Sequence, residues 1–279
     1  MKLSVIVSTY NSPLWLEKVL WGYSKQSHPD FELIIADDGS TVETAELIER
    51  MRQETKLTIQ HVWQKDCGFR KCRILNKAIL HARSEYLIFT DGDCIPRQDF
   101  LAIHAQNAEP GYFLSGGYYK LPMSTSGAIG KEEILNGRCF ELSWLVSHGL
   151  PRSYKNLKLT ATYSQARVFN KLTPTRCNFK GSNGSAWLKD TLEVNGYDER
   201  MPWGGEDREF GVRLLNKGIK ARHVRYNAIC IHLDHPRGYK DVEQVAANKA
   251  LRKKTEATGI TRTDNGISQL LAAGYQPDR

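Results

Sequence analysis

The sequence has no long hydrophobic run, and this absence excludes a large class of proteins. No window in its 279 residues approaches 18 consecutive apolar positions, so we expect no membrane-spanning helix. The first residues, Met1–Val7, turn polar too early for a signal peptide, and we interpret them as the first strand of a cytoplasmic protein.

Cysteine pairs and glycine-rich dinucleotide loops are also missing. The six cysteines include no CxxC pair and no zinc-like spacing, so we expect reduced thiols that pack as small hydrophobic groups. No GxGxxG sequence follows the first apolar run, which argues against an oxidoreductase that binds a dinucleotide.

What the sequence does contain is an ordinary globular composition with a basic balance. Hydrophobic residues make up 41% and charged residues 25%, and the formal net charge is +8. This charge indicates an anionic partner. Nucleic acid, an anionic membrane surface and phosphorylated small molecules all fit it.

The first hundred residues alternate between strand and helix patterns. Ser12-Pro13 is a typical helix start, with a polar cap and a proline in the first turn. Strands separated by helices form βαβ units, so we expect a parallel sheet with helices on both faces. The pattern predicts strands at 3–9, 31–36, 57–63 and 86–90, and helices at 43–53 and 70–83.

The pattern loosens after about residue 115, and we still expect one continuous α/β domain. A polar tail at the end of the chain is expected to be mobile. The remaining predicted elements are strands at 114–121 and 228–232, an apolar segment at 185–188, and helices at about 131–148, 206–217 and 241–257.

Asp91, Gly92 and Asp93 directly follow the apolar run 86–90. Two carboxylates on either side of a glycine, at the end of a buried strand, place oxygen ligands where open α/β sheets bind their ligands. Mg²⁺ and Mn²⁺ favour one or two carboxylates together with substrate phosphates. The alternative is an ordinary surface turn, because Asp and Gly are common turn residues.

Two further polar loops follow the first two expected strands. Together with the Asp-Gly-Asp turn they could hold a nucleotide diphosphate, with the Asp38 carboxylate accepting the N–H of a uracil base. The alternative for Asp37 and Asp38 is capping of the following helix. The other side chains that we assign to this site from the first loop are Thr9, Tyr10 and Asn11.

A basic stretch lies at the start of the helix expected at 70–83. Arg70, Lys71 and Arg73 could meet phosphate oxygens there, aided by the helix dipole. The alternative is a solvated basic face. Taken together, we expect at least one of these cations to contact the nucleotide.

The run Trp203-Gly204-Gly205-Glu206-Asp207 precedes the helix expected at 206–217. Helical spacing places Asp207 on the same face as Phe210 and Leu214, so its carboxylate points inward at a helix N-terminus. That position suits a general base. The two glycines could act as a hinge and Trp203 could pack on a sugar ring. Simple charging of the helix N-terminus explains the two acids but not the Trp-Gly-Gly sequence.

His232 and His235 follow the strand expected at 228–232. Either imidazole could be a further ligand of a metal held by Asp91 and Asp93. A single histidine beside a strand is more often structural, but two within four residues and next to Asp234 favour a ligand.

These motifs together resemble a family 2 inverting glycosyltransferase of the GT-A fold, a mixed sheet flanked by helices. The second half is similar to β-1,4-galactosyltransferase and chondroitin-polymerase catalytic domains. The resemblance rests on the segments 5–11, 36–40, 85–93, 181–187, 195–198 and 203–207.

The resemblance implies transfer of a sugar from a UDP-sugar to a hydroxyl of a glycan, with Mn²⁺ or Mg²⁺ bound through Asp93 and Asp91 nearby. Asp207 is implied as the base, with Glu206 beside it on the acceptor. The family commonly has an Arg-Asn pair where this chain has Leu75-Asn76, so the role of that arginine could fall to Arg70 or Arg73. Residues implied at the acceptor are Asn183, Trp203, Gly204 and Gly205.

The resemblance also divides the chain. We expect a single GT-A domain at 3–240, with a nucleotide-sugar half (3–120), an acceptor half with insertions (121–240), and a C-terminal helix and polar tail (241–279). Cations between 152 and 180 could face a phosphorylated glycan, a lipid-linked diphosphate or an anionic membrane. We favour a bacterial surface glycan such as lipopolysaccharide or capsule, peripheral contact with the inner membrane, and no nucleic acid.

The sequence argues against three alternative functions: a nucleotidyltransferase, a processive synthase and a non-catalytic binding protein. A nucleotidyltransferase would carry a glycine-rich, arginine-containing loop after the first strand, where this chain has Ser-Thr-Tyr-Asn. A processive synthase would carry Gln-x-x-Arg-Trp and membrane spans, and their absence favours transfer of one sugar at a time. A non-catalytic protein with the same fold would be expected to lose Asp93 or Asp207, and both are present.

Overall fold

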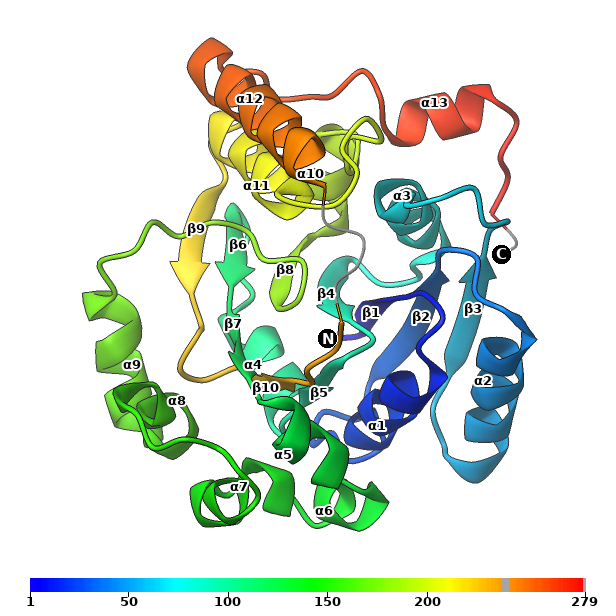
Figure 1. Ribbon diagram of the computed structural model, residues 1–279. Helices are drawn as coiled ribbons and strands as arrows, with labels where there is room; N and C mark the ends of the chain where they lie inside the picture. Colours follow the sequence, from blue (N-terminus) through cyan, green and yellow to red (C-terminus); the bar gives the residue numbers. More distant parts are fainter. Residues whose placement is uncertain (237–240, 278–279) are drawn as a thin grey trace.

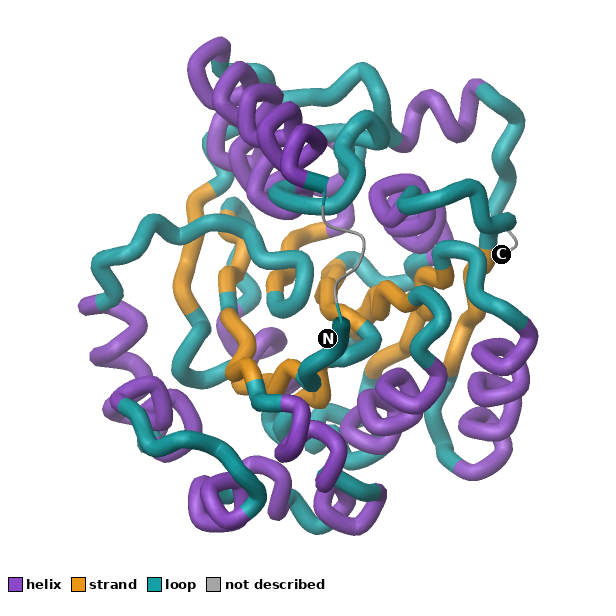
Figure 2. The backbone as a smooth tube through the Cα atoms, viewed as in Figure 1, coloured by secondary structure: helices purple, strands orange, loops and turns teal. Residues whose placement is uncertain are grey.

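The chain forms two sheets, a large one flanked by helices and a small one that crosses its end (Figures 1 and 2). The structure is a computed structural model that describes residues 1–236 and 241–277. The seven-stranded sheet has the order β3-β2-β1-β4-β8-β6-β9 and the three-stranded sheet the order β5-β10-β7. The strands are β1 (Leu3–Thr9), β2 (Phe31–Asp37), β3 (Ile59–Trp63), β4 (Tyr86–Asp91), β5 (Cys94–Pro96), β6 (Tyr112–Ser115), β7 (Gly117–Lys120), β8 (Gly184–Trp187), β9 (Lys220–His223) and β10 (Ile229–His232).

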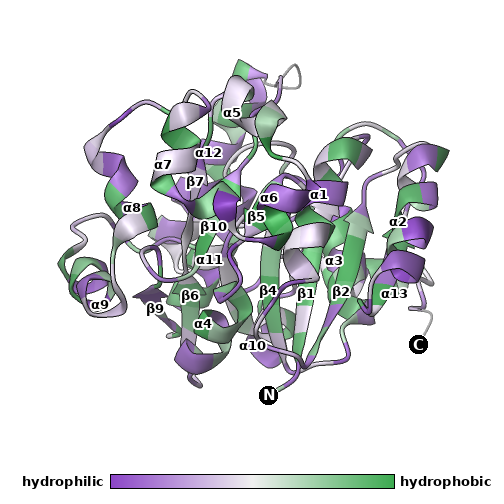
Figure 3. Cartoon of the chain, turned by 90° about the horizontal axis from the view of Figure 1, so that it is seen from below, coloured by the Kyte–Doolittle hydropathy of each residue, from purple (hydrophilic) through white to green (hydrophobic). Residues whose placement is uncertain are grey.

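Helices cover both faces of the large sheet. One apolar cluster lies between the sheet and the side of α1 and α2, and a second lies on the side of α3 and α11. In Figure 3 the strands are mostly hydrophobic and the outer helices carry hydrophilic residues. The helices are α1 (Pro13–Tyr23), α2 (Val42–Glu54), α3 (Lys71–His81), α4 (Phe100–Asn107), α5 (Met123–Ala128), α6 (Lys131–Leu135), α7 (Leu142–Ser147), α8 (Leu157–Thr160), α9 (Tyr163–Leu172), α10 (Leu188–Glu193), α11 (Glu206–Asn216), α12 (Val242–Thr258) and α13 (Ile267–Ala272).

The first half of the large sheet follows the predicted βαβ pattern. Strand β1 pairs in parallel with both β2 and β4, and β2 pairs in parallel with β3. The three polar loops therefore leave neighbouring strands at one edge, as expected for parallel strands. The predicted elements are confirmed here, although β3 begins at Ile59 rather than at residue 57.

The second half makes the sheet mixed. Strand β8 is antiparallel to β4 and β6, and β6 is parallel to β9. The single strand predicted at 114–121 is wrong, because β6 and β7 belong to different sheets. The break falls at Gly116, whose backbone N–H donates to the Asn183 carbonyl at 2.8 Å. A Cβ at Gly116 would lie 2.2 Å from Asn183 Oδ1, so only glycine allows this approach.

The single helix predicted at 131–148 is also wrong. The chain forms α6, a short 3₁₀ turn (Arg138–Phe140) and α7 instead. Gly137 has a φ of +80°, the left-handed conformation that ends helices, and it interrupts the apolar periodicity. Sequence periodicity did not predict α4 and β9.

The C-terminal tail is packed, so the expectation of a mobile tail is wrong for the described residues. Ile267 and Leu270 of α13 are buried. The Asn195 side chain accepts from the Ser268 backbone N–H at 2.8 Å and donates to the Thr263 carbonyl at 2.8 Å. These contacts are made by polar groups, which hydrophobic periodicity does not detect.

Candidate active site

A cleft of about 1160 Å³ opens at the carboxyl edge of β1 and β4. Its other walls are the start of α11, one side of α12 and the segment after β10. The sequence-predicted residues that line it are Thr9, Tyr10, Asn11, Asp38, Asp91, Gly92, Asp93, Trp203, Gly204, Gly205, Glu206, Asp207, His232 and His235. Three separate parts of the chain thus meet in one cleft.

The Asp-Gly-Asp turn is held tightly against β1. The Gly92 backbone N–H donates to the Ser8 carbonyl at 2.7 Å. A Cβ on Gly92 would lie 3.1 Å from both that oxygen and Thr9 Oγ1, so a larger residue would push the turn away from the strand. The glycine therefore fixes where the two neighbouring carboxylates, Asp91 and Asp93, are presented.

The negative charge of Asp91 is compensated by the ammonium group of Lys71. Its Oδ1 accepts from Lys71 Nζ at 2.6 Å and from Ser8 Oγ at 2.8 Å. Burial disfavours the ionised form of Asp91, but attraction to the Lys71 ammonium and these two hydrogen bonds outweigh it and lower its pKa. Burial likewise opposes the charge on Lys71, and attraction to Asp91 and then to Glu206 outweighs it and raises the pKa of the lysine.

Asp93 faces the two histidines. Its Oδ2 lies 3.0 Å from His235 Nε2 and 3.4 Å from His232 Nε2. Pairing of β10 with β5 places His232 opposite Cys94, so the small sheet brings these groups together. Asp93, Cys94 and His232 each offer a ligand atom, and these atoms lie within 4.8 Å of one another.

This group fits a divalent cation. A carboxylate and an imidazole are suitable ligands for Mn²⁺, whereas a thiol suits softer ions. The fully buried Cys94 Sγ lies 3.3 Å from Asp93 Oδ1 as a hydrogen-bond donor, which indicates a protonated, structural thiol. Asp93 with His232 and His235 is therefore the metal-binding candidate among the described residues.

Asp38 lies at the other end of the strand edge. Its two oxygens accept from Gln64 Nε2 at 2.7 Å and from the Arg70 backbone N–H at 2.8 Å. Burial raises the pKa of Asp38 and these hydrogen bonds partly offset the rise. The nearby Thr9 Oγ1 is buried without a hydrogen-bond partner among the described residues, so it is available to a bound molecule.

The start of α11 presents two acids to the cleft. Gly205, with φ of +93°, caps the helix, and Asp207 Oδ2 accepts from the Gly181 backbone N–H at 3.2 Å. Glu206 Oε2 accepts from the Gly204 backbone N–H at 3.0 Å. Burial, followed by the negative charge of Asp207, raises the pKa of Glu206. The helix dipole favours the ionised form of a carboxylate in this first turn.

Helix α12 fixes the loop before these acids. Asn248 Nδ2 lies within 3.1–3.3 Å of the carbonyls of Pro202, Trp203 and Gly204. Gly204 also packs close to α12, since a Cβ there would lie 3.2 Å from Val245 Cγ2. The Trp-Gly-Gly loop is therefore held by side-chain contacts in this structure.

Three predicted residues do not line the cleft. Asn183 is fully buried, where its amide donates to the Gly117 and Ala228 carbonyls and its Oδ1 lies 3.0 Å from His104 Nε2. Arg73 pairs with Glu199 at 2.8 Å, and Arg70 reaches the site through its backbone N–H.

Five cations line the cleft, and sequence reasoning had singled out two of them, Lys71 and Lys180, only as members of larger basic groups. Lys71 lies in the basic stretch that the sequence had indicated, but nothing local distinguished it from its neighbours. The others lie in the segment before β8, in α11 and in α12, and they are Lys180, Arg208, Lys249 and Arg252.

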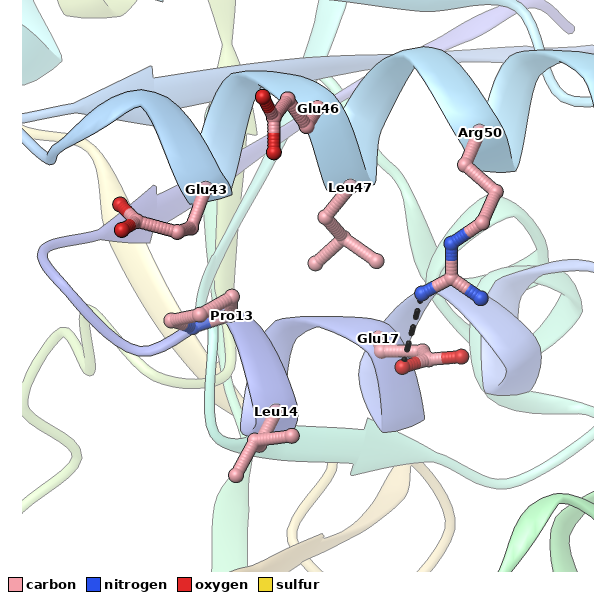
Figure 4. A pocket seen from close by; sticks show the side chains of 7 residues that line it. All are labelled: Pro13, Leu14, Glu17, Glu43, Glu46, Leu47 and Arg50. Carbon is pink, nitrogen blue, oxygen red and sulfur yellow. Dashed lines mark ion pairs between the residues drawn. The ribbon is translucent and has the colours of Figure 1, made fainter.

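A second, smaller pocket of about 360 Å³ lies between α1 and α2 (Figure 4). Arg50 pairs there with Glu17 at 3.1 Å, and Glu43 and Glu46 are exposed. Its lining comes from α1 and α2 alone and includes no histidine to join the carboxylates as a metal ligand. The cleft is the better candidate site.

Two family models match the chain. Residues 4–156 match the family described as "Glycosyl transferase family 2", and residues 172–236 match "N-terminal domain of galactosyltransferase". The first match covers more than half of the chain.

The similarity to individual proteins is below 30% identity in the two examples given next. The chain is 27% identical to chondroitin synthase from Escherichia coli over 266 residues, 88% of this chain and 36% of that protein. It is 29% identical over 232 residues to validoxylamine A glucosyltransferase from Streptomyces hygroscopicus subsp. jinggangensis, 78% of this chain and 52% of that protein. The chain thus spans about a third and about half of these two proteins.

Solved structures show the same fold, GT-A. The S. aureus TarS 1-349 complex with UDP-GlcNAc has a TM-score of 0.61 at 19% identity, covering 96% of this chain and 69% of that one. The mannosyltransferase PcManGT from Pyrobaculum calidifontis, in complex with GDP-Man and Mn²⁺, has a TM-score of 0.58 at 18% identity, covering 99% and 76%. No described helix is both long enough and apolar enough to cross a bilayer.

Proposed function

The chain belongs to glycosyl transferase family 2, and from this premise we propose that it moves a single sugar from a UDP-sugar to a hydroxyl of a glycan acceptor. We further propose that the reaction needs a divalent metal and inverts the anomeric centre. Family membership identifies the chain as a glycosyltransferase, in place of the nucleotidyltransferase and non-catalytic alternatives.

One observation supports the proposal most strongly. Asp93, beside two imidazoles, and Asp207, at the start of α11, line the same cleft although 114 positions separate them in the sequence. A nucleotide sugar bound between them would have its diphosphate near the first and its sugar near the second.

Asp93 with His232 and His235 would hold Mn²⁺ or Mg²⁺, which when bound supplies positive charge to the departing diphosphate. The Lys71 ammonium lines the same end of the cleft, where it could also donate to an oxygen of the diphosphate besides its contact with Asp91. Both charges favour departure of UDP in the transition state.

Asp207 is the proposed general base. Its carboxylate removes the proton of an acceptor hydroxyl while the hydroxyl oxygen forms a bond to the anomeric carbon. The bond from that carbon to the UDP oxygen breaks at the same time, with its electron pair leaving on UDP. A single displacement of this kind inverts the configuration. Glu206, directly before Asp207 at the start of α11, would contact another hydroxyl of the acceptor.

The nucleotide and the acceptor are proposed from the chemistry of each end. Asp38 can still accept the N–H of uracil, since a carboxylate has about four acceptor sites and two are in use. Thr9 Oγ1 offers a further unpaired polar atom. For the acceptor we propose a bacterial surface polysaccharide or lipopolysaccharide unit, including lipid-linked forms, handled by a cytoplasmic enzyme.

A donor screen tests the proposal. Purified protein is incubated with UDP- and GDP-sugars, with and without Mn²⁺, and release of nucleoside diphosphate is measured. We expect release from one UDP-sugar, only with metal, and transfer products of inverted configuration by NMR. Release from GDP-sugars alone would contradict the uracil assignment, and metal-independent release would contradict the metal site.

A further inference from the structure

We propose that the outer surface of α8 and α9 binds the surface of an anionic lipid bilayer. This proposal goes beyond the proposed function and does not depend on it. The surface also includes the 3₁₀ turn Tyr154–Asn156 directly before α8 and is called the α8–α9 surface. Its residues are Tyr154, Lys155, Leu157, Tyr163, Arg167, Val168, Lys171 and Leu172.

The first observation is an extreme separation of charge along the chain. Residues 142–189 contain eight lysines and arginines and no aspartate or glutamate. The net charge of the whole chain is also +8, so the rest of the sequence is balanced. Three of these cations, Lys155, Arg167 and Lys171, are exposed on the α8–α9 surface, whereas Arg176 pairs with Glu256 and Lys180 lines the cleft. A group of exposed cations of one sign attracts a surface of the opposite sign.

The second observation is that apolar side chains are exposed among these cations. Tyr154 is 80% exposed and Leu172 is 72% exposed, and Leu157, Tyr163 and Val168 are each at least half exposed. Exposed tyrosines and aliphatic side chains interleaved with cations are typical of segments that lie in the interface of a membrane.

The third observation is the arrangement on α9. Arg167 and Lys171 are four residues apart, as are Val168 and Leu172, so the outward face carries a basic stripe next to an apolar stripe. The inward face is already occupied. Ala166 is buried and the Phe169 ring packs on Tyr226 at 5.4 Å between centroids. The outward stripes are therefore left for another partner.

The position of this surface makes a bilayer a sensible partner. Helices α8 and α9 lie side by side at the outer end of the molecule, away from α2 and β3 (Figures 1 and 3). Lys158 of α8 donates to the Tyr118 carbonyl at 3.4 Å, and Tyr118 lines the cleft. A protein bound through the α8–α9 surface would hold the cleft near the lipid surface.

The test is co-sedimentation of the full chain with vesicles, without any sugar donor. We expect binding to vesicles of equal parts phosphatidylcholine and phosphatidylglycerol, and none to phosphatidylcholine alone. The double variant Lys155→Gln/Lys171→Gln should bind about 25-fold more weakly, since each cation near an anionic bilayer contributes about fivefold. The matched control Lys25→Gln/Lys56→Gln removes two exposed charges elsewhere and should bind as the wild type does.

A second pair of variants distinguishes a bilayer from a soluble polyanion. Tyr154→Ser/Leu172→Ser keeps every charge, and it should weaken vesicle binding while leaving binding to polyphosphate unchanged. UDP release from the donor should be unaffected in all variants, because none of these side chains lines the cleft. Absence of binding to anionic vesicles, equal losses in the control, or no effect of Tyr154→Ser/Leu172→Ser on vesicle binding would each overturn the proposal.

Discussion

The two ends of the cleft, which we propose bind the nucleotide and the acceptor, differ in how their charges are compensated. At the nucleotide end the carboxylates already have partners: Asp91 has Lys71, and Asp38 has Gln64 and the Arg70 backbone N–H. At the acceptor end the cations Lys180, Arg208, Lys249 and Arg252 line the wall, and none of them forms an ion pair with another described residue.

This difference indicates two modes of binding. The nucleotide end is preorganised, so its side chains lose little freedom when the donor enters. The acceptor end has unpaired positive charge around two acids, and we expect it to gain compensation only from an anionic or strongly polar acceptor.

Asp207→Asn should have the largest effect on turnover. Loss of a general base typically costs about 10²–10⁴-fold in rate, whereas donor affinity should be retained because the nucleotide end is untouched. Steady-state transfer and calorimetric titration of the donor measure the two quantities. The exposed Asp30→Asn is the matched control, and wild-type turnover in Asp207→Asn would remove the base assignment.

Asp93→Asn and Asp91→Asn should separate the roles of the two carboxylates. We expect Asp93→Asn to weaken Mn²⁺ binding about 10–100-fold, because Asp93 faces both histidines. The change at Asp91 should act mainly through Lys71 and weaken Mn²⁺ less. Mn²⁺ titrations followed by electron paramagnetic resonance test this, and equal losses in both variants would contradict the division.

Lys71→Met should destabilise the nucleotide end by about 1–3 kcal/mol, since it leaves the Asp91 charge in the cleft without its cation. The pKa of Asp91 should rise, because burial opposes its charge and the lysine no longer offsets this effect. Adding Asp91→Asn should restore part of the loss, because no uncompensated charge remains. Denaturant unfolding of the two single variants and the double variant measures the coupling. Strictly additive losses would show that the pair is not coupled.

Asn248→Ala should loosen the Trp-Gly-Gly loop at the acceptor end. Removal of the hydrogen bonds from its amide should cost about 1 kcal/mol and lower kcat, with donor affinity little changed. The exposed Lys253→Ala on the same helix is the control. A change in donor affinity with an unaltered kcat would contradict the assignment of this loop to the acceptor end of the cleft.

Glu206→Gln should stabilise the folded protein slightly at neutral pH. The pKa of Glu206 is raised, so its protonated form contributes stability below its ordinary value of 4.5, and this contribution is lost as the pH rises through the raised value. The ionised group is therefore unfavourable at neutral pH. Gln should raise the melting temperature at pH 7, by about 2–4 °C if the gain is 1 kcal/mol, and leave it unchanged at pH 3.

Local sequence was enough to predict the nucleotide half. Each βαβ unit is continuous in sequence. The Asp-Gly-Asp turn can be recognised from the sequence because its three residues are adjacent. Lys71 could not be separated from Arg70 and Arg73, because the choice depends on where α3 begins. Arg73 meets Glu199, a partner 126 positions away.

The acceptor half was harder to predict for the same reason. Asn183 matched a family motif, but its partners His104, Gly117 and Ala228 come from three other segments, and they bury it beneath the cleft. Gly116 and Gly137 broke elements whose apolar spacing continued past them. Contacts between distant segments decided these positions, and periodicity does not encode them.

The most direct test of the central claim is a crystal structure of Asp207→Asn bound to its UDP-sugar and Mn²⁺. We expect an ion coordinated by Asp93 and at least one of His232 and His235, uracil beside Asp38, and the anomeric carbon open to residue 207 across the cleft. An ion bound elsewhere, or a sugar directed away from residue 207, would contradict it.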